Sequence, residues 1–197
     1  MLRDFQALAS ASLPSNIGYA QPAQPMPARV TLDSPATEVM TDLTRVTAVI
    51  ILPGDGVDEA HRRMIQRGVR LLLVVDQDRK LQGVVTATDV LGEKPVQIAA
   101  ERGIRRDEVL VRDIMTSRER LQALDMDQVG AARVGHIVTT LKQAGRQHTL
   151  VADHDEKGSS RLRGVFSSTQ IARQLGVNIQ TNVVANTFAE IEAQLAR

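Results

Sequence analysis

Two short stretches of the chain carry hydroxyl and acidic side chains at a spacing that could bind a small polar ligand. Residues 81–92 read Leu-Gln-Gly-Val-Val-Thr-Ala-Thr-Asp-Val-Leu-Gly, and residues 162–172 read Leu-Arg-Gly-Val-Phe-Ser-Ser-Thr-Gln-Ile-Ala. In each, an apolar run that opens with glycine predicts a strand, and the hydroxyl residues after it predict the start of a helix. Thr86, Thr88 and the N–H groups of the helix N-terminus could hold a phosphate. The Asp89 carboxylate could accept two hydrogen bonds from a vicinal diol such as ribose.

The same residues also have a purely structural interpretation. Thr86, Thr88 and Asp89 could do no more than cap the helix that follows them. A single copy of the stretch would favour capping over ligand binding. The glycine that opens the strand, Gly83, indicates that another backbone segment comes close at this point.

The surroundings of the two stretches are repeated as well. Residues 68–76 align with residues 145–153, and Val39-Met40-Thr41 aligns with Ile114-Met115-Thr116. The spacing between the copies grows only where turns are expected. This conserved order predicts a tandem repeat, and the repetition favours ligand binding over capping alone.

Each repeat is predicted to have the element order β-α-β-β-α. The elements predicted for the first repeat are a strand over 46–52, a helix from Asp58 to Gly68, a strand over 71–75 and the strand and helix of 81–92. Those predicted for the second are a strand over 121–126, a helix over 134–144, a strand over 149–152 and the strand and helix of 162–172. The continuous apolar run at 71–75 is typical of a strand that is covered on both faces.

The remaining segments complete the expected domain organisation. The predicted order is an N-terminal arm over 1–35, the first repeat over 36–92, a helix and linker over 93–112, the second repeat over 113–176 and a C-terminal segment over 177–197. The arm is rich in Ala, Pro, Gln and Ser, which favours an extended segment that is flexible or docks on a partner. A capping box at Thr187–Glu190 predicts a helix in the last segment.

Composition excludes several classes of function. The chain has 197 residues, 43% of them hydrophobic, with a net charge of +1, no Cys, no Trp, one Tyr and three Phe. The balanced charge does not indicate a nucleic-acid partner, and no apolar run is long enough to span a membrane. The absence of Cys fits a cytoplasmic protein and excludes thiol catalysis. With so few aromatic residues, a bound heterocycle would have to contact aliphatic side chains.

Motifs of catalysis are absent from the sequence. There is no H-E-x-x-H, no G-x-S-x-G, no Walker A motif and no G-x-G-x-x-G, and no pair of carboxylates is placed for acid–base work. The four histidines, His61, His136, His148 and His154, lack the spacing of metal ligands. We therefore expect neither an enzyme nor a metal site.

The tandem β-α-β-β-α units, the Ile114-Met115-Thr116 motif and the Gly-x-x-Thr-x-Thr-Asp motif together resemble a pair of cystathionine-β-synthase (CBS) domains, or Bateman module, of the stand-alone bacterial type. The resemblance extends over about Val39 to Gly176. It implies an α/β (α+β) fold in which two repeats pack as a pseudo-two-fold pair. It also implies clefts that bind AMP, ADP, ATP or S-adenosylmethionine as a regulatory ligand, with no covalent cofactor.

The resemblance also implies roles for particular residues. The first site would consist of Thr47, Val49, Arg70, Leu71, Thr86, Thr88 and Asp89, and the second of Gln147, His148, Ser167, Thr169 and Gln170. In the first site, Asp89 would hold the ribose, and Arg70 would reach phosphate. Gln170 replaces the ribose-binding acid in the second site. We therefore expect two unequal sites, of which the Asp89 site is the tighter for a ribonucleotide.

Two functions follow from this reading. The leading hypothesis is a regulatory module that binds an adenosine-type ligand and transmits its occupancy to a protein partner, whose identity the sequence does not indicate. The alternative is a ligand-free adaptor that uses the same fold to dimerise. In both cases a homodimer is expected, through helix faces that include Met64, Val134 and Leu141.

Overall fold

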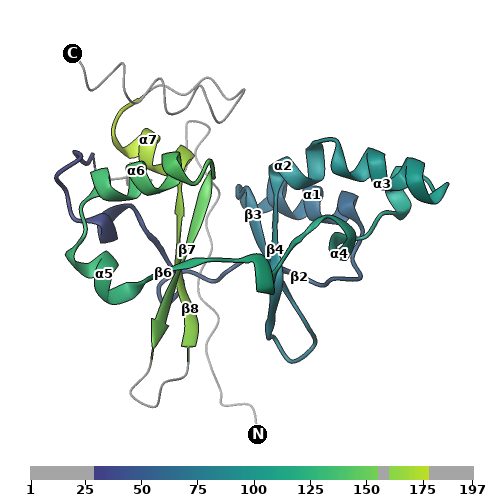
Figure 1. Ribbon diagram of the computed structural model, residues 1–197, viewed down its shortest axis with the longest axis horizontal. Helices are drawn as coiled ribbons and strands as arrows, with labels where there is room; N and C mark the ends of the chain where they lie inside the picture. Colours follow the sequence, from purple (N-terminus) through teal and green to yellow (C-terminus); the bar gives the residue numbers. More distant parts are fainter. Residues whose placement is uncertain (1–28, 155–159, 178–197) are drawn as a thin grey trace, which may run out of the picture.

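The computed structural model of the chain describes residues 29–154 and 160–177, which form two α/β units side by side (Figure 1). Most of the predicted arm and the predicted C-terminal helix lie outside these residues. Within them, no helix is long and apolar enough to cross a membrane.

The first unit is a four-stranded sheet in the order β2-β3-β4-β5. Strands β2 and β3 are parallel, and the other neighbours are antiparallel. The elements are β2 (Ile50–Ile51), α1 (Val57–Arg67), β3 (Leu71–Val75), β4 (Leu81–Thr86), α2 (Ala87–Leu91), α3 (Lys94–Arg102), the 3-10 turn η2 (Arg106–Glu108), α4 (Val111–Ile114) and β5 (Thr116–Ser117). Gly68 ends α1 with φ of 63°, a left-handed conformation that favours glycine.

The second unit is a sheet in the order β1-β8-β7-β6. Its elements are η1 (Ala36–Val39), β1 (Thr41–Asp42), β6 (Ala123–Asp125), α5 (Met126–Ala131), α6 (Val134–Gln143), β7 (His148–His154), β8 (Ser160–Ser167) and α7 (Ser168–Gln174), and η3 (Arg118–Arg120) leads into it from β5. The predicted β-α-β-β-α order is confirmed in both units, with α5 as an additional helix. The strand predicted over 46–52 is wrong in its extent, because only β2 pairs within the sheet.

Each sheet is completed by a strand from the other repeat. Strand β1 pairs with β8, with Thr41 opposite Val165, and β5 pairs with β4, with Thr116 opposite Val84. The close approach expected at Gly83 is confirmed, since a Cβ there would lie 2.3 Å from the carbonyl oxygen of Thr116. We call residues 43–49, which connect β1 in the second sheet to β2 in the first, the crossing segment.

The hydrophobic core of each unit also contains residues from outside its own repeat. Val30, Ala36 and Val39 are buried with the second unit, although Val30 belongs to the predicted arm and Ala36 and Val39 to the first repeat. Val111, from the linker, and Ile114, from the second repeat, are buried in the first unit. Figure 1 shows the purple N-terminal segment beside the green helices of the second unit. A unit in space therefore combines residues from both repeats in sequence.

The two units pack on each other through the faces of their sheets that the helices leave uncovered. Leu73 and Val75 of β3 and Leu150 of β7 belong to one buried cluster between the units. Leu72 and Val74, which alternate with them, point into the core of the first unit. The prediction that the 71–75 strand is covered on both faces is confirmed.

The residues expected to form a dimer face are buried within the chain. Met64 lies in the core of the first unit, and Val134 and Leu141 lie in the core of the second. The expectation that these side chains face a partner is wrong, because helical spacing shows an apolar face without showing which segment covers it. The N-terminal segment and the strands cover them here.

Candidate functional site: a pocket between the two units

A pocket of about 850 Å³ lies where the crossing segment, α1 and β3 of the first unit meet β7, β8 and α7 of the second. We call it the interunit pocket. Its volume falls in the range of small-molecule sites. Because both units supply its walls, a ligand that fills the pocket would contact both.

The interunit pocket combines residues from both of the predicted sites. Its lining includes Thr47, Val49, Arg70 and Leu71 from the first set and His148, Ser167, Thr169 and Gln170 from the second. Thr86, Thr88, Asp89 and Gln147 are not among its lining residues. The strand exchange is the reason. Since β1 belongs to the second sheet, the crossing segment starts beside β8 and α7, and it brings Thr47 and Val49 to the second motif.

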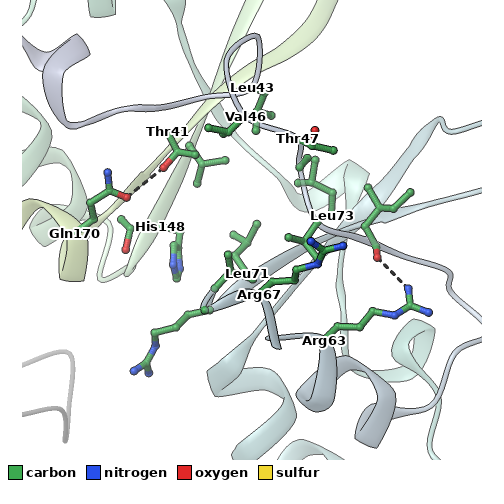
Figure 2. A pocket seen from close by; sticks show the side chains of 18 of the residues that line it. Thr41, Leu43, Val46, Thr47, Arg63, Arg67, Leu71, Leu73, His148 and Gln170 are labelled. Atoms are coloured by element: carbon green, nitrogen blue, oxygen red, sulfur yellow. Dashed lines mark hydrogen bonds between the residues drawn. The ribbon is translucent and has the colours of Figure 1, made fainter. Parts of the chain in front are cut away.

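One edge of the pocket is formed by a hydrogen bond between the two repeats. The Thr41 hydroxyl donates to Oε1 of Gln170 at 3.2 Å, and Figure 2 shows this pair on one side of the pocket, opposite Arg63 and Arg67. The amide nitrogen of Gln170 has no hydrogen-bond partner among residues 29–154 and 160–177. It is therefore available as a donor to a ligand.

The crossing segment is anchored at its start by Asp42. Arg163 donates to both carboxylate oxygens of Asp42, at 3.0 and 2.9 Å. The amide and hydroxyl of Thr44 donate to Oδ1 at 2.9 and 2.7 Å. The hydrogen bonds from Arg163 and then Thr44 hold the pKa of Asp42 well below its usual range. These contacts fix the direction in which the chain leaves β1 toward the pocket.

The charged lining of the pocket is mostly positive. Five arginines line it, namely Arg63, Arg67, Arg70, Arg79 and Arg173, against one carboxylate, Glu59. Arg63 pairs with Glu59, and its Nη2 lies 3.3 Å from Oδ2 of Asp55. The other four arginines form no ion pair with any part of the chain that the structure describes. The site therefore presents a positive field to a ligand.

His148 is the first residue of β7 and lies between the two edges of the pocket (Figure 2). Burial, with a smaller contribution from the charge of Arg70, lowers the pKa of His148 to about 4. Both effects disfavour the protonated imidazole. His148 is consequently neutral at pH 7 and can act as either donor or acceptor toward a ligand.

The remaining wall of the pocket is aliphatic. Leu43, Val49, Leu71, Leu73 and Val165 line it, and none of its lining residues is Phe, Tyr or Trp. A flat heterocycle would therefore lie between aliphatic side chains. Among the residues that the structure describes, no group of acidic or histidine side chains is placed to hold a metal ion.

Asp89 caps its own helix. Its Oδ2 accepts hydrogen bonds from the Thr86 amide at 3.0 Å and the Thr86 hydroxyl at 2.6 Å, and the Asp89 amide donates to Thr86. Its Oδ1 is paired with the ammonium group of Lys94, which also donates to the Ile114 carbonyl. Both oxygens of the carboxylate are therefore engaged within the protein.

Sequence reasoning missed several lining residues. Arg63 and Arg67 lie one helical turn apart at the end of α1, and Arg173 follows Gln170 by three residues on α7. That spacing places each pair on one helix face. A search for basic residues one turn from the motifs would have found these three. Thr41 could not be found in this way, because its contact with Gln170 depends on the strand exchange.

Comparison with known proteins agrees with this architecture. Residues 29–95 match the family model of the CBS domain. An uncharacterized conserved protein from Pyrococcus horikoshii is 21% identical, with 78% of this chain and 100% of that chain covered and a TM-score of 0.54. A CBS-domain containing protein from Agrobacterium tumefaciens is 18% identical, with 81% and 98% covered and a TM-score of 0.51. No curated protein matches the chain.

A third solved structure contains a ligand. CBSX2 from Arabidopsis thaliana, solved in complex with AMP, is 18% identical, with 83% of this chain and 99% of that chain covered and a TM-score of 0.49. The family match in the first repeat and the fold of both repeats identify the architecture. Residues 29–95 thus match a CBS domain, and the two repeats together have the fold of a CBS-domain containing protein of known structure.

Proposed function

We propose that this chain is a regulatory module that binds an adenosine-type ligand in the interunit pocket and transmits its occupancy to a protein partner. The observation that carries the proposal is the composition of the pocket, whose walls come from both units and combine aliphatic, hydroxyl and unpaired basic side chains. Such a lining suits a ligand with a flat apolar base, a polar sugar and an anionic group.

Each part of the ligand has a suitable partner in the pocket. Val49 and Leu71 offer aliphatic surface to the base. The hydroxyls of Ser167 and Thr169 offer hydrogen bonds to sugar or phosphate, and Arg70 offers a charged donor to phosphate. Only some of the residues that the sequence predicts to bind a ligand line this pocket. We assign ligand binding to those of the crossing segment and the second motif.

The position of the pocket between the two units explains how ligand binding could be transmitted to a partner protein. A ligand that contacts both units and the crossing segment binds one relative arrangement of the units better than others. Such a ligand shifts the population toward the arrangement it binds best. A partner protein that contacts both units would then respond to occupancy.

A second candidate function is a ligand-free adaptor that forms a homodimer. It is favoured by large apolar side chains exposed on the helices of the first unit, since Ile65, Leu91 and Val96 are 68%, 59% and 58% exposed. Light scattering tests this candidate directly. A dimer that Ile65→Glu converts to a monomer would support the adaptor, whereas a wild-type monomer at micromolar concentration would exclude it.

Calorimetry of the full chain against AMP, ADP, ATP and S-adenosylmethionine tests the leading proposal. We expect at least one of them to bind, and Thr169→Ala to weaken it about threefold to tenfold through loss of a hydrogen bond. Thr88→Ala is the matched control, because Thr88 is the equivalent residue of the first repeat and is exposed outside the pocket. If Thr88→Ala weakened binding and Thr169→Ala did not, the ligand would belong at the Asp89 side. If no ligand bound, the adaptor would be favoured.

A further inference from the structure

We propose that the ligand of the interunit pocket carries a chain of two or more phosphate groups, as a nucleoside diphosphate or triphosphate does. This inference rests on the proposed function and narrows it. Its basis is an excess of positive charge that a nucleoside monophosphate would leave largely uncompensated.

The excess charge can be counted from the contacts. Of the charged lining residues, Glu59 and Arg63 neutralise each other in a close pair. Arg67, Arg70, Arg79 and Arg173 then remain, and none of them has an acidic partner among the described residues. Four guanidinium groups around one cavity repel one another. An anion with several charges relieves that repulsion more completely than an anion with one phosphate.

The unpaired arginines also come from both sides of the pocket. Arg67 ends α1 and Arg70 precedes β3 in the first unit, whereas Arg173 lies on α7 in the second. A chain of phosphates presents anionic oxygens along its length, so it can accept hydrogen bonds from both units together. A single phosphate presents one compact group of oxygens.

The glutamine at position 170 also supports a ligand with several phosphate groups. An acidic residue at this position would repel a phosphate chain, and the glutamine amide does not. The Thr41 hydroxyl already donates to Oε1 of Gln170, so the NH₂ group is what remains for the ligand. A free NH₂ donor suits anionic oxygen, whereas a carboxylate would suit the hydroxyls of a ribose.

The same field disfavours cationic adenosine derivatives. S-adenosylmethionine carries a positive sulfonium next to the adenosine, which would lie among the unpaired arginines. Like charges in a partly enclosed site weaken binding. The pocket should therefore select against this ligand even though its adenosine part is the same.

The test is a calorimetric series with adenosine, AMP, ADP, ATP and S-adenosylmethionine on the full chain, at low and high salt. We expect affinity to rise with each phosphate, by about tenfold or more from AMP to ATP, because each phosphate adds charge-assisted hydrogen bonds. We expect S-adenosylmethionine to bind more weakly than AMP. Salt should weaken ATP more than AMP, because screening acts on each charge.

Variants that remove one positive charge test which arginines cause the preference for ATP over AMP. Arg70→Gln and Arg173→Gln should each reduce the ratio of ATP to AMP affinity several-fold. Arg112→Gln, an exposed arginine on α4 outside the pocket lining, is the control and should leave the ratio unchanged. All three side chains are exposed, and thermal unfolding of each variant verifies that the fold is retained.

The outcomes separate this inference from the proposed function. Equal affinities for AMP and ATP, or tightest binding of S-adenosylmethionine, would overturn the inference and leave an adenosine sensor in place. A ratio that Arg70→Gln and Arg173→Gln leave unchanged would also overturn it. Absence of binding by every member of the series would overturn both.

Discussion

Lys94 pairs with the Asp89 carboxylate, so the acid that the sequence predicts to bind a ribose is paired with a cation of the protein itself. In the second repeat, Gln170 takes the equivalent position and contacts Thr41 at the edge of the interunit pocket. Two related motifs thus have different roles. The Asp89 motif stabilises its own helix, and the Gln170 motif lines a cavity.

This difference reverses the sequence-based expectation that the Asp89 site is the tighter of the two. Asp89→Asn should lower the free energy of unfolding by about 1–2 kcal/mol, because it weakens a helix cap and an ion pair, and should leave ligand affinity nearly unchanged. Gln170→Ala should weaken ligand binding several-fold with little effect on unfolding. Urea denaturation and calorimetry on both variants measure the two effects. A loss of affinity in Asp89→Asn alone would restore the original assignment.

A substitution at Gly83 tests the strand exchange, because it acts on the pairing of β4 with β5. Gly83→Ala should destabilise the protein by about 1–3 kcal/mol, because the new Cβ would lie 2.3 Å from the Thr116 carbonyl oxygen and would force β5 away from β4. Gly130→Ala is the control, because Gly130 lies in α5 with open space where a Cβ would be, and alanine favours helix. Urea midpoints of the two variants should shift in opposite directions. Equal midpoints would argue against the pairing of β4 with β5.

The ion pair of Asp42 predicts a dependence of stability on acid pH. The pKa of Asp42 is lower in the folded chain than the ordinary value of 3.8, so its contribution is present above about pH 4 and is lost as pH falls further. The urea midpoint should therefore fall below pH 4 and should fall less steeply in Asp42→Asn. Asp78→Asn, at an exposed hairpin position with no hydrogen bond or ion pair to any residue that the structure describes, should keep the wild-type slope. A wild-type slope in Asp42→Asn would contradict this prediction.

His148 provides a reporter of the charge in the pocket. Its pKa of about 4 lies below the ordinary value of 6.5, so protonation favours the unfolded chain, and His148 costs stability as pH falls from about 6.5 toward 4. In an NMR titration its midpoint should lie near 4, and should rise in Arg70→Gln and when ATP neutralises the arginines. A midpoint near 6.5 in the free protein would show that His148 is solvated and does not face the cavity.

Local patterns in the sequence were enough to predict the secondary structure and the fold class of this protein. The apolar run from Leu71 to Val75, the glycine at position 68 and the repeated glycine–hydroxyl motif were enough to predict the element order, the fold class and the close approach at Gly83. These features succeed because helix ends, strand burial and glycine positions depend on neighbours along the chain.

Tertiary structure alone decided which segments meet. A two-residue strand such as β1 requires a partner edge, but its sequence does not state whether the edge belongs to its own repeat or to the other. Pairing with β8 carried Thr47 and Val49 to Ser167 and away from Asp89. The same packing gathered arginines from α1 and α7 around one cavity. Because these contacts join residues far apart in the chain, no local pattern could specify them.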